Sequence, residues 1–183
     1  IIDEIELIKK LVEKDDMESF EILVLAYREK GLKFALRYNS DYYLAEDLVQ
    51  EAFARIYVKR KGIKIKGNFK AYLFQIIRNL AIDQHRKQSR IEEQHLTDEL
   101  NDQGLSPEDE ILKNEESGLI KTLLGSLNEK YRTVLYLQKY EEMSYEEIAK
   151  IMSISKGQVR MLIYRGKKKL KALIEKEREL ISL

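Results

Sequence analysis

Two helix-capping sequences, eleven residues apart, constrain the fold of this chain more than any other feature. Ser144 is followed at the third position by Glu147, and Ser155 is followed in the same way by Gln158. In such a pair, each side chain satisfies a backbone N–H group that the first turn of a helix leaves free. The stretch YEEIAKIM after the first serine therefore forms one helix, SIS forms a turn, and a longer helix begins at Lys156. This spacing predicts a helix-turn-helix.

The other periodic segments are also helical. Apolar residues recur every three or four positions after Asp16 and after Asp41, which are both suitable N-caps, and again over residues 68–88. The chain has one Pro, eight Gly and no Cys, so its composition favours helices and excludes a disulfide framework. We therefore predict an all-α fold.

Charge is distributed unevenly, although the net charge of the 183 residues is only +1. Residues 1–90 have 18 Lys and Arg against 14 Asp and Glu, residues 91–116 have one against ten, and residues 118–183 have 14 against eight. Two basic regions indicate two surfaces for a polyanion, although charge runs are also common on solvated faces. We predict a helical domain over 1–90, an acidic flexible linker over 91–106 and a second helical domain over 107–183, which begins with the helix-start pattern Ser106-Pro107.

The helix from Lys156 has one apolar and one basic face. At 100° per residue, Val159, Ile163 and Gly166 point inward and Leu162 lies half-buried at the edge. The residues that could face DNA are Lys156, Gln158, Arg160, Met161, Tyr164, Arg165 and Lys168. The alternative is a generic helical hairpin with a solvated basic face. Met161 would contact a thymine methyl group or simply be exposed.

Beyond this motif, the chain resembles a known family in four segments that occur in the same order and spacing. They are AEDLVQEAF (45–53), NFKAYLFQIIRNLAIDQHRK (68–87), LNEKYRTVLYLQKYEEMSYEEIAKIM (127–152) and KGQVRMLIYRGKKKL (156–170). The family is the extracytoplasmic-function group of sigma-70-type sigma factors. The resemblance implies two small helical domains, a sigma region 2 bundle and a sigma region 4 helix-turn-helix, that direct promoter-specific transcription initiation by RNA polymerase.

The resemblance also implies which residues meet which partner. In the family, the first segment docks on the clamp helices of the largest subunit of bacterial core RNA polymerase, and the matching residues are Glu46, Asp47, Gln50, Glu51 and Phe53. The second segment captures the promoter −10 strand, and its matching residues are Asn68, Phe69, Phe74, Arg78, Asn79, Asp83, Arg86 and Lys87. For Phe69 and Phe74, core packing remains the alternative. The helix from Lys156 would read the −35 duplex, and further implied partners are the flap of the second polymerase subunit and an anti-sigma factor.

Several positions depart from the family pattern. Tyr72 stands where the family usually has Trp, and this chain has no Trp. Ser155, Gln158, Met161 and Leu162 replace the Pro, Thr, Ser and Arg that are typical of the recognition helix. Tyr72 preserves an aromatic side chain for packing, whereas Leu162 removes an expected phosphate contact.

No pattern in the sequence indicates catalysis, a metal site or a cofactor. His85 and His95 have no second ligand at metal spacing, and no Gly-rich phosphate loop follows a strand. No apolar run approaches the roughly 18 residues of a membrane span, and the lack of Cys fits a reducing cytoplasm. We expect a cytoplasmic protein that is not an enzyme and has no membrane insertion. The alternative function is a stand-alone helix-turn-helix regulator, which would bind duplex operators as a homodimer.

Overall fold

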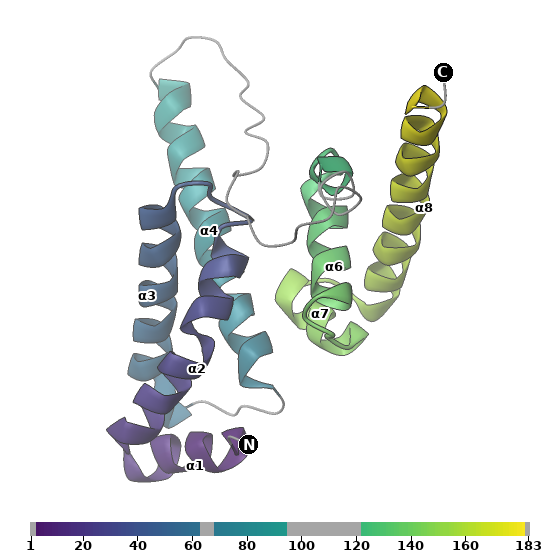
Figure 1. Cartoon of the computed structure of the whole chain (residues 1–183). Coiled ribbons are helices and arrows are strands. Elements are labelled where there is room, and N and C mark those ends of the chain that lie inside the picture. Colours follow the sequence, from purple (N-terminus) through teal and green to yellow (C-terminus); the bar gives the residue numbers. More distant parts are fainter. Residues whose placement is uncertain (1–2, 63–67, 95–121, 182–183) are drawn as a thin grey trace. The chain divides into compact units, whose positions relative to one another are not determined.

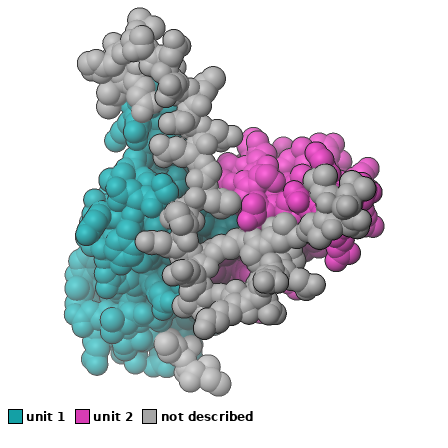
Figure 2. Space-filling view, turned by 45° about the horizontal axis from the view of Figure 1, so that its top comes forward, with its two compact units in different colours: residues 1–101 teal, residues 102–183 magenta. Residues whose placement is uncertain are grey.

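The computed structural model describes residues 3–62, 68–94 and 122–181. Every regular element in these ranges is a helix (Figure 1), which confirms the predicted all-α fold. The chain divides into two compact units, residues 1–101 and residues 102–183 (Figure 2). Each unit has its own set of buried apolar side chains.

Unit 1 contains three long helices, α2 (Met17–Ala35), α3 (Tyr42–Lys59) and α4 (Phe69–Gln94). A short helix, α1 (Glu4–Lys14), lies across one end of them, where the 3-10 turn η1 (Arg60–Gly62) follows α3 (Figure 1). The side chain of Asp16 accepts a hydrogen bond from the Ser19 N–H at 3.2 Å, and that of Asp41 accepts one from the Leu44 N–H at 3.2 Å. Both predicted N-caps are therefore confirmed.

Aromatic side chains form the centre of unit 1. The rings of Phe34 and Phe74 stack with centroids 4.2 Å apart and planes at 3°. Gly31 allows α2 to approach its neighbours closely, because a Cβ atom there would lie 3.2 Å from Cδ1 of Ile77. The apolar pattern breaks at Gly31, yet α2 continues through it, since the missing side chain is what the packing requires.

Unit 1 differs from the prediction in two places. The first is α1, a helix that was not predicted. It begins at Glu4, and the side chain of its N-cap residue, Asp3, accepts a hydrogen bond from the Glu6 N–H at 3.2 Å. The second is α4, which continues to Gln94 and so includes residues 91–94 of the predicted linker. Residues 91–94 are Ile, Glu, Glu and Gln, none of which breaks a helix.

The described part of unit 2 contains a short helical stretch at residues 122–125. It also contains α6 (Glu129–Lys139), α7 (Tyr145–Met152) and α8 (Lys156–Ile181). Both α6 and α7 pack against α8. Gly166 of α8 lies close to α6, because a Cβ atom there would be 3.2 Å from Cδ1 of Leu135. The predicted helix start at Ser106-Pro107 and residues 95–106 of the predicted linker lie outside the described residues.

Candidate nucleic-acid interface and protein-docking face

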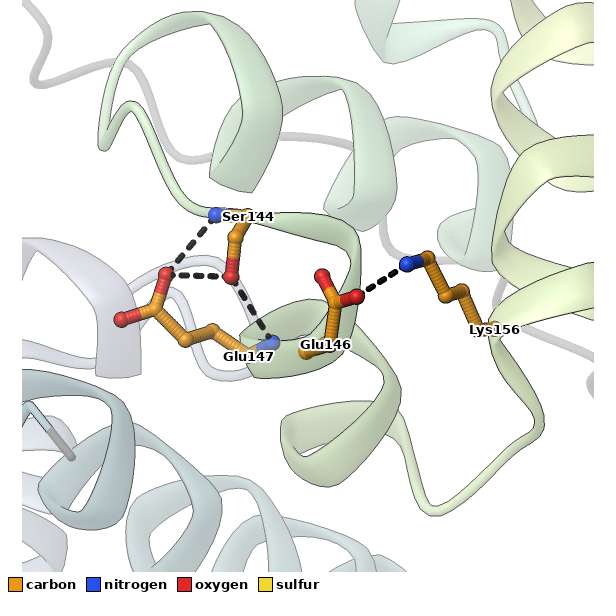
Figure 3. A network of polar contacts seen from close by, with 4 residues as sticks. All are labelled: Ser144, Glu146, Glu147 and Lys156. Carbon is orange, nitrogen blue, oxygen red and sulfur yellow. Dashed lines mark hydrogen bonds and ion pairs between the residues drawn. The ribbon is translucent and has the colours of Figure 1, made fainter. Parts of the chain in front are cut away.

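The helix-turn-helix consists of α7, the turn at residues 153–155 and the first turns of α8. The backbone N–H of Ser144 donates to the Glu147 carboxylate at 2.8 Å, and the Glu147 N–H donates to the Ser144 hydroxyl at 3.3 Å (Figure 3). Similarly, the Ser155 N–H donates to Oε1 of Gln158 at 2.8 Å, and the Gln158 N–H donates to Oγ of Ser155 at 3.2 Å. Both predicted capping boxes are confirmed, and they define where α7 and α8 begin.

The two faces of α8 differ in exposure as predicted. Val159 and Ile163 are buried, and Leu162 is half-buried. Met161 and Tyr164 are 50% and 64% exposed. The other predicted DNA-facing residues, Lys156, Gln158, Arg160, Arg165 and Lys168, are exposed as well. Such a face combines cations for phosphate oxygens with apolar groups that could contact thymine methyls.

Two residues of this face already have partners within unit 2. Lys156 forms an ion pair with Glu146 of α7 (Figure 3). The hydrogen bond from Lys156 holds the pKa of the Glu146 carboxyl below its usual range. Gln158 uses its side-chain oxygen in the capping box, which leaves its NH₂ group to donate. Glu146 therefore competes with a phosphate for Lys156.

The predicted −10 residues on α4 fall into two groups. Asn79, Asp83, Arg86 and Lys87 are exposed, and Asn68 is partly exposed. The Asn68 side chain accepts a hydrogen bond from the Lys70 N–H at 2.8 Å, so it caps the start of α4. Phe69 and Phe74 belong to the second group, because both are 0% exposed.

Direct contact of these two aromatic residues with DNA, which the family resemblance implies, does not fit their burial. Phe74 stacks on Phe34, and the ring of Phe69 lies 5.4 Å from that of Tyr27. Neither ring is accessible to a base in this conformation. Their position therefore favours the core-packing alternative for both residues.

Arg78 lies half-buried near the middle of α4. Its Nε atom is buried and has no hydrogen-bond partner among the described residues. A buried donor without a partner typically costs about 1–3 kcal/mol, and such a group in a native protein calls for a specific explanation. Tyr72, which replaces the usual Trp, is partly buried, and this burial raises the pKa of its hydroxyl.

The predicted polymerase-binding motif lies on α3. Asp47 and Gln50 are exposed, whereas Glu46 forms an ion pair with Arg28 of α2. This pair ties α3 to α2 and reduces the net negative charge of the motif. A protein partner would thus meet exposed polar groups on a helix whose position is held by its neighbour.

The negative charge at the C-terminal end of the polymerase-binding motif is also partly neutralised. Glu51 pairs with Arg55 one turn further along α3, at 2.7 Å. Phe53 is only 6% exposed and makes an edge contact with Phe20, with ring centroids 6.3 Å apart. Direct contact between Phe53 and a partner does not fit this burial. Phe53 instead packs in the core beneath the exposed face of α3.

Two contacts that the residues before α2 make with Arg60 and Phe69 were not predicted. Asp15 pairs with Arg60, and the Glu4 carboxylate accepts a hydrogen bond from the Phe69 N–H at 3.4 Å. The partners are 45 and 65 residues apart in the chain. No local pattern could therefore have revealed them, although the Asp3 cap could have revealed α1.

The described residues contain no group of three or more His, Cys, Asp or Glu that could hold a metal ion. The Nε2 atom of His85 lies 2.8 Å from the carbonyl oxygen of Tyr38, which links α4 to the turn after α2. His95 is outside the described residues. Within the ranges searched, the helices are too short or too polar to cross a membrane.

Comparison with known proteins identifies both units. The sequence models of sigma-70 region 2 and sigma-70 region 4 match residues 23–91 and 117–170. Over 172 residues the chain is 33% identical to the ECF RNA polymerase sigma factor SigW of Bacillus subtilis, covering 88% of this chain and 92% of that protein. It is also 30% identical over 170 residues to the RNA polymerase sigma-H factor of Pseudomonas aeruginosa, covering 85% and 86% of the two chains.

Two solved structures have the same fold. One is the sigma factor RpoE in complex with the anti-sigma factor NepR from Bartonella quintana, with a TM-score of 0.69 and 24% identity over 86% of this chain and 98% of that one. The other is CnrH in complex with the cytosolic domain of CnrY, with a TM-score of 0.66 and 22% identity over 94% and 97% of the chains. Because the two sigma-70 regions occur in order and the identity to SigW spans most of both chains, this chain belongs to the extracytoplasmic-function RNA polymerase sigma factors.

Proposed function

We propose that this sigma factor directs core RNA polymerase to promoters through three surfaces on its two units. The exposed face of α3 binds core polymerase, α4 with the segment before it binds the −10 strand, and the outward face of α8 binds the −35 duplex. The protein acts in the cytoplasm as a DNA-binding subunit without catalysis or cofactor. The proposal rests chiefly on the exposure of the outward face of α8, which combines cationic and apolar side chains.

At the −35 element, α8 lies in the major groove with its N-terminal turns nearest the base edges. Arg160, Met161 and Tyr164 face the bases, since they are exposed in the first three turns. Arg165 and Lys168 lie one turn further on and contact phosphates, which add affinity but no sequence information. The capping boxes support this role because they fix where α7 and α8 begin.

At the −10 element, the protein holds one strand after the duplex has opened. Extruding a base costs a few kcal/mol, and contacts with the free strand must offset this cost. The stretch from Arg55 to Arg90 contains 11 basic residues and only Asp83 as an acid. Arg78, which is half-buried, and Asn79, which is exposed, provide donors. Phe69 and Phe74 act only by holding α4 in place.

The polymerase-binding face comprises Asp47 and Gln50, with Glu46 and Glu51 at its sides. Its exposed groups are acidic or hydrogen-bonding and lie on the helix that carries the AEDLVQEAF motif. The resemblance to the family assigns this face to the clamp helices of the largest polymerase subunit. By the same resemblance, unit 2 meets the flap of the second subunit.

An anti-sigma factor is a further proposed partner. Both of the solved structures compared above are complexes, one with an anti-sigma factor and one with a cytosolic domain of another protein. A partner of this kind would inhibit the protein if it covered the α3 face or the outward face of α8. Loss of holoenzyme formation on adding the partner would test this.

Run-off transcription tests the proposed function. Full-length protein and core RNA polymerase would be incubated with a genomic fragment library, and the transcription start sites would be mapped. We expect start sites preceded by two shared sequence elements at a constant spacing. Core polymerase alone is the control, and a start-site map unchanged by the protein would contradict the proposal.

A stand-alone regulator is not favoured, because it would not need a sigma-70 region 2. It predicts a homodimer that binds duplex operators without polymerase. Size determination with and without core polymerase separates the two functions. A sigma factor gives a complex with core polymerase, whereas a regulator stays dimeric and separate from it.

A further inference from the structure

We infer that Tyr43, flanked by Tyr42 and Leu44, is the apolar anchor through which the α3 face binds core RNA polymerase. This inference rests on the proposed function, which assigns the α3 face to core polymerase. It adds to that face three residues that lie outside the AEDLVQEAF motif and directly precede its first residue, Ala45.

The motif by itself presents no exposed apolar side chain. All five of its apolar residues are at most 7% exposed, namely Ala45, Leu48, Val49, Ala52 and Phe53. What remains on the surface is polar, and two of its carboxylates already have partners within unit 1. Exposed ion pairs contribute little binding energy, whereas a few desolvated side chains, often Tyr, Trp or Arg, contribute most of it. The polar groups alone therefore lack the kind of residue that usually dominates an interface.

The start of α3 provides such a residue. Tyr43 is 77% exposed, and its neighbours Tyr42 and Leu44 are 45% and 38% exposed. Single exposed apolar residues are ordinary on protein surfaces, but three in succession are unusual unless they serve binding. The rings of Tyr42 and Tyr43 meet edge to face, with centroids 5.9 Å apart and planes at 90°. Together the three side chains form an exposed apolar patch.

Tyr43 lies on the same side of α3 as the exposed polar residues of the motif. At 100° per residue, Asp47 and Gln50 both lie within about 40° of Tyr43 around the helix axis. Asp47 is about 6 Å further along that axis. A partner that contacts Asp47 and Gln50 therefore also covers Tyr43. Because the patch is continuous with the polymerase-binding face, we assign it to core polymerase rather than to a second copy of the chain.

The backbone under the patch is fixed by local hydrogen bonds. The Asp41 carboxylate accepts from the N–H groups of Tyr43 at 2.8 Å and Leu44 at 3.2 Å, and the Asp41 N–H donates to Oδ1 of Asn39 at 3.0 Å. The ion pair between Arg28 and Glu46 holds the next turn of α3 against α2. A surface that is ordered before binding loses less conformational entropy on association, and a tyrosine has few rotatable bonds to immobilise. These features suit Tyr43 to an anchoring role.

The decisive variant is Tyr43→Ser, which removes the aromatic ring. Full-length protein carrying a fluorescent label would be titrated with core RNA polymerase. We expect the Kd to rise about tenfold to thirtyfold, as truncation of an anchor residue does. The thermal unfolding midpoint should stay unchanged, because the side chain is 77% exposed in the free protein. Tyr43→Phe should retain most of the affinity, since it keeps the ring and loses only the hydroxyl.

The matched control is Ile5→Ser. Ile5 is 78% exposed on α1, which lies at the end of unit 1 where α3 ends, whereas Tyr43 is at the start of α3 (Figure 1). This variant also removes an exposed apolar side chain and should bind core polymerase with wild-type affinity.

Salt dependence separates an apolar anchor from a charged contact. Between about 0.1 M and about 1 M salt, the Debye length falls from about 10 Å to about 3 Å, so interactions between exposed charges are screened. The fold-loss of Tyr43→Ser relative to wild type should persist at the higher salt concentration. The fold-loss of Asp47→Lys combined with Glu51→Lys should shrink, because that loss is electrostatic.

Four results would overturn the inference. They are wild-type affinity of Tyr43→Ser, an equal loss in Tyr43→Phe, an equal loss in Ile5→Ser, and a dimer of the free protein that Tyr43→Ser dissociates, which would assign the patch to a second copy. A wild-type protein that forms no holoenzyme, or wild-type affinity of Asp47→Lys with Glu51→Lys, would instead contradict the proposed function. The two failures are therefore distinguishable.

Discussion

The helices α4 and α8 both have 26 residues, yet they present their predicted DNA-binding residues differently. All seven predicted residues of α8 are exposed. On α4, Phe69 and Phe74 are buried and Arg78 is half-buried. Each helix packs against two neighbours, α8 against α6 and α7, and α4 against α2 and α3. The predicted residues of α8 follow from helical rotation and therefore share one face, whereas those of α4 follow from the family resemblance and include both buried and exposed positions.

The largest expected effect concerns the buried aromatic residues of α4. Phe74→Ala removes a ring that is 0% exposed and stacked on Phe34. We expect unit 1 to lose about 3–5 kcal/mol of unfolding free energy, measured by hydrogen exchange of the α2–α4 amides in urea. Binding of a −35 duplex should be retained, and Phe74→Leu should have a smaller effect. If the Phe74→Ala protein kept its normal stability but lost binding of the −10 strand, Phe74 would instead contact DNA directly.

The next effect concerns the α3 face. Asp47→Lys combined with Glu51→Lys should weaken binding of core polymerase by about 3 kcal/mol or more, which is over a hundredfold, because it places cations where an acidic face meets its partner. The measurement is holoenzyme formation by size-exclusion chromatography and fluorescence titration. Isolated −35 duplex binding should remain intact.

A matched control for this double variant is Glu13→Lys with Glu21→Lys. These residues are exposed on α1 and α2, and the change in net charge is the same. The control should form holoenzyme normally. If the α3 variant formed holoenzyme with wild-type affinity, the assignment of the α3 face to polymerase binding would be contradicted.

A smaller effect tests the open face of α8 at Met161, which is 50% exposed. If Met161 contacts a thymine methyl, replacing that thymine with uracil should weaken binding by about 0.8 kcal/mol, roughly fourfold. Met161→Ser should then be insensitive to the same replacement. Competition binding with uracil at each position of the −35 duplex measures both. Identical profiles for the two proteins would show that Met161 is merely exposed.

The smallest effect concerns the competition between Glu146 and DNA for Lys156. Glu146→Gln should release Lys156 and tighten −35 duplex binding by about twofold, with a steeper salt dependence from one additional phosphate contact. The matched control is Glu142→Gln, an exposed acid in the loop before α7. An unchanged salt slope would mean that Lys156 does not reach a phosphate.

The pH dependence of this pair has a definite sign. The hydrogen bond from Lys156 lowers the folded-state pKa of Glu146. The stabilisation is therefore present above the unfolded pKa of a glutamate and is lost only as the pH falls through the lowered value. At neutral pH Glu146 remains charged, so the effect of Glu146→Gln measures the paired state.

Several features were predictable because the interactions that create them are local. The caps at Asp16 and Asp41 and the boxes at Ser144 and Ser155 join residues two or three positions apart. Their hydrogen bonds form within one turn of helix, whatever the rest of the chain does. The outward position of Met161 follows in the same way from the 100° rotation per residue.

By itself, the amino-acid sequence determined the helical class, the helix-turn-helix and the exposed face of α8. The tertiary structure alone decided that Phe53, Phe69 and Phe74 are buried. It also decided that Arg60 is held by Asp15 from 45 positions away and that Phe69 receives a cap from Glu4, 65 positions away. The physical reason is that local hydrogen bonds and helical rotation are set within a few residues. Burial and distant ion pairs depend on which helices pack together, and only the folded chain specifies that.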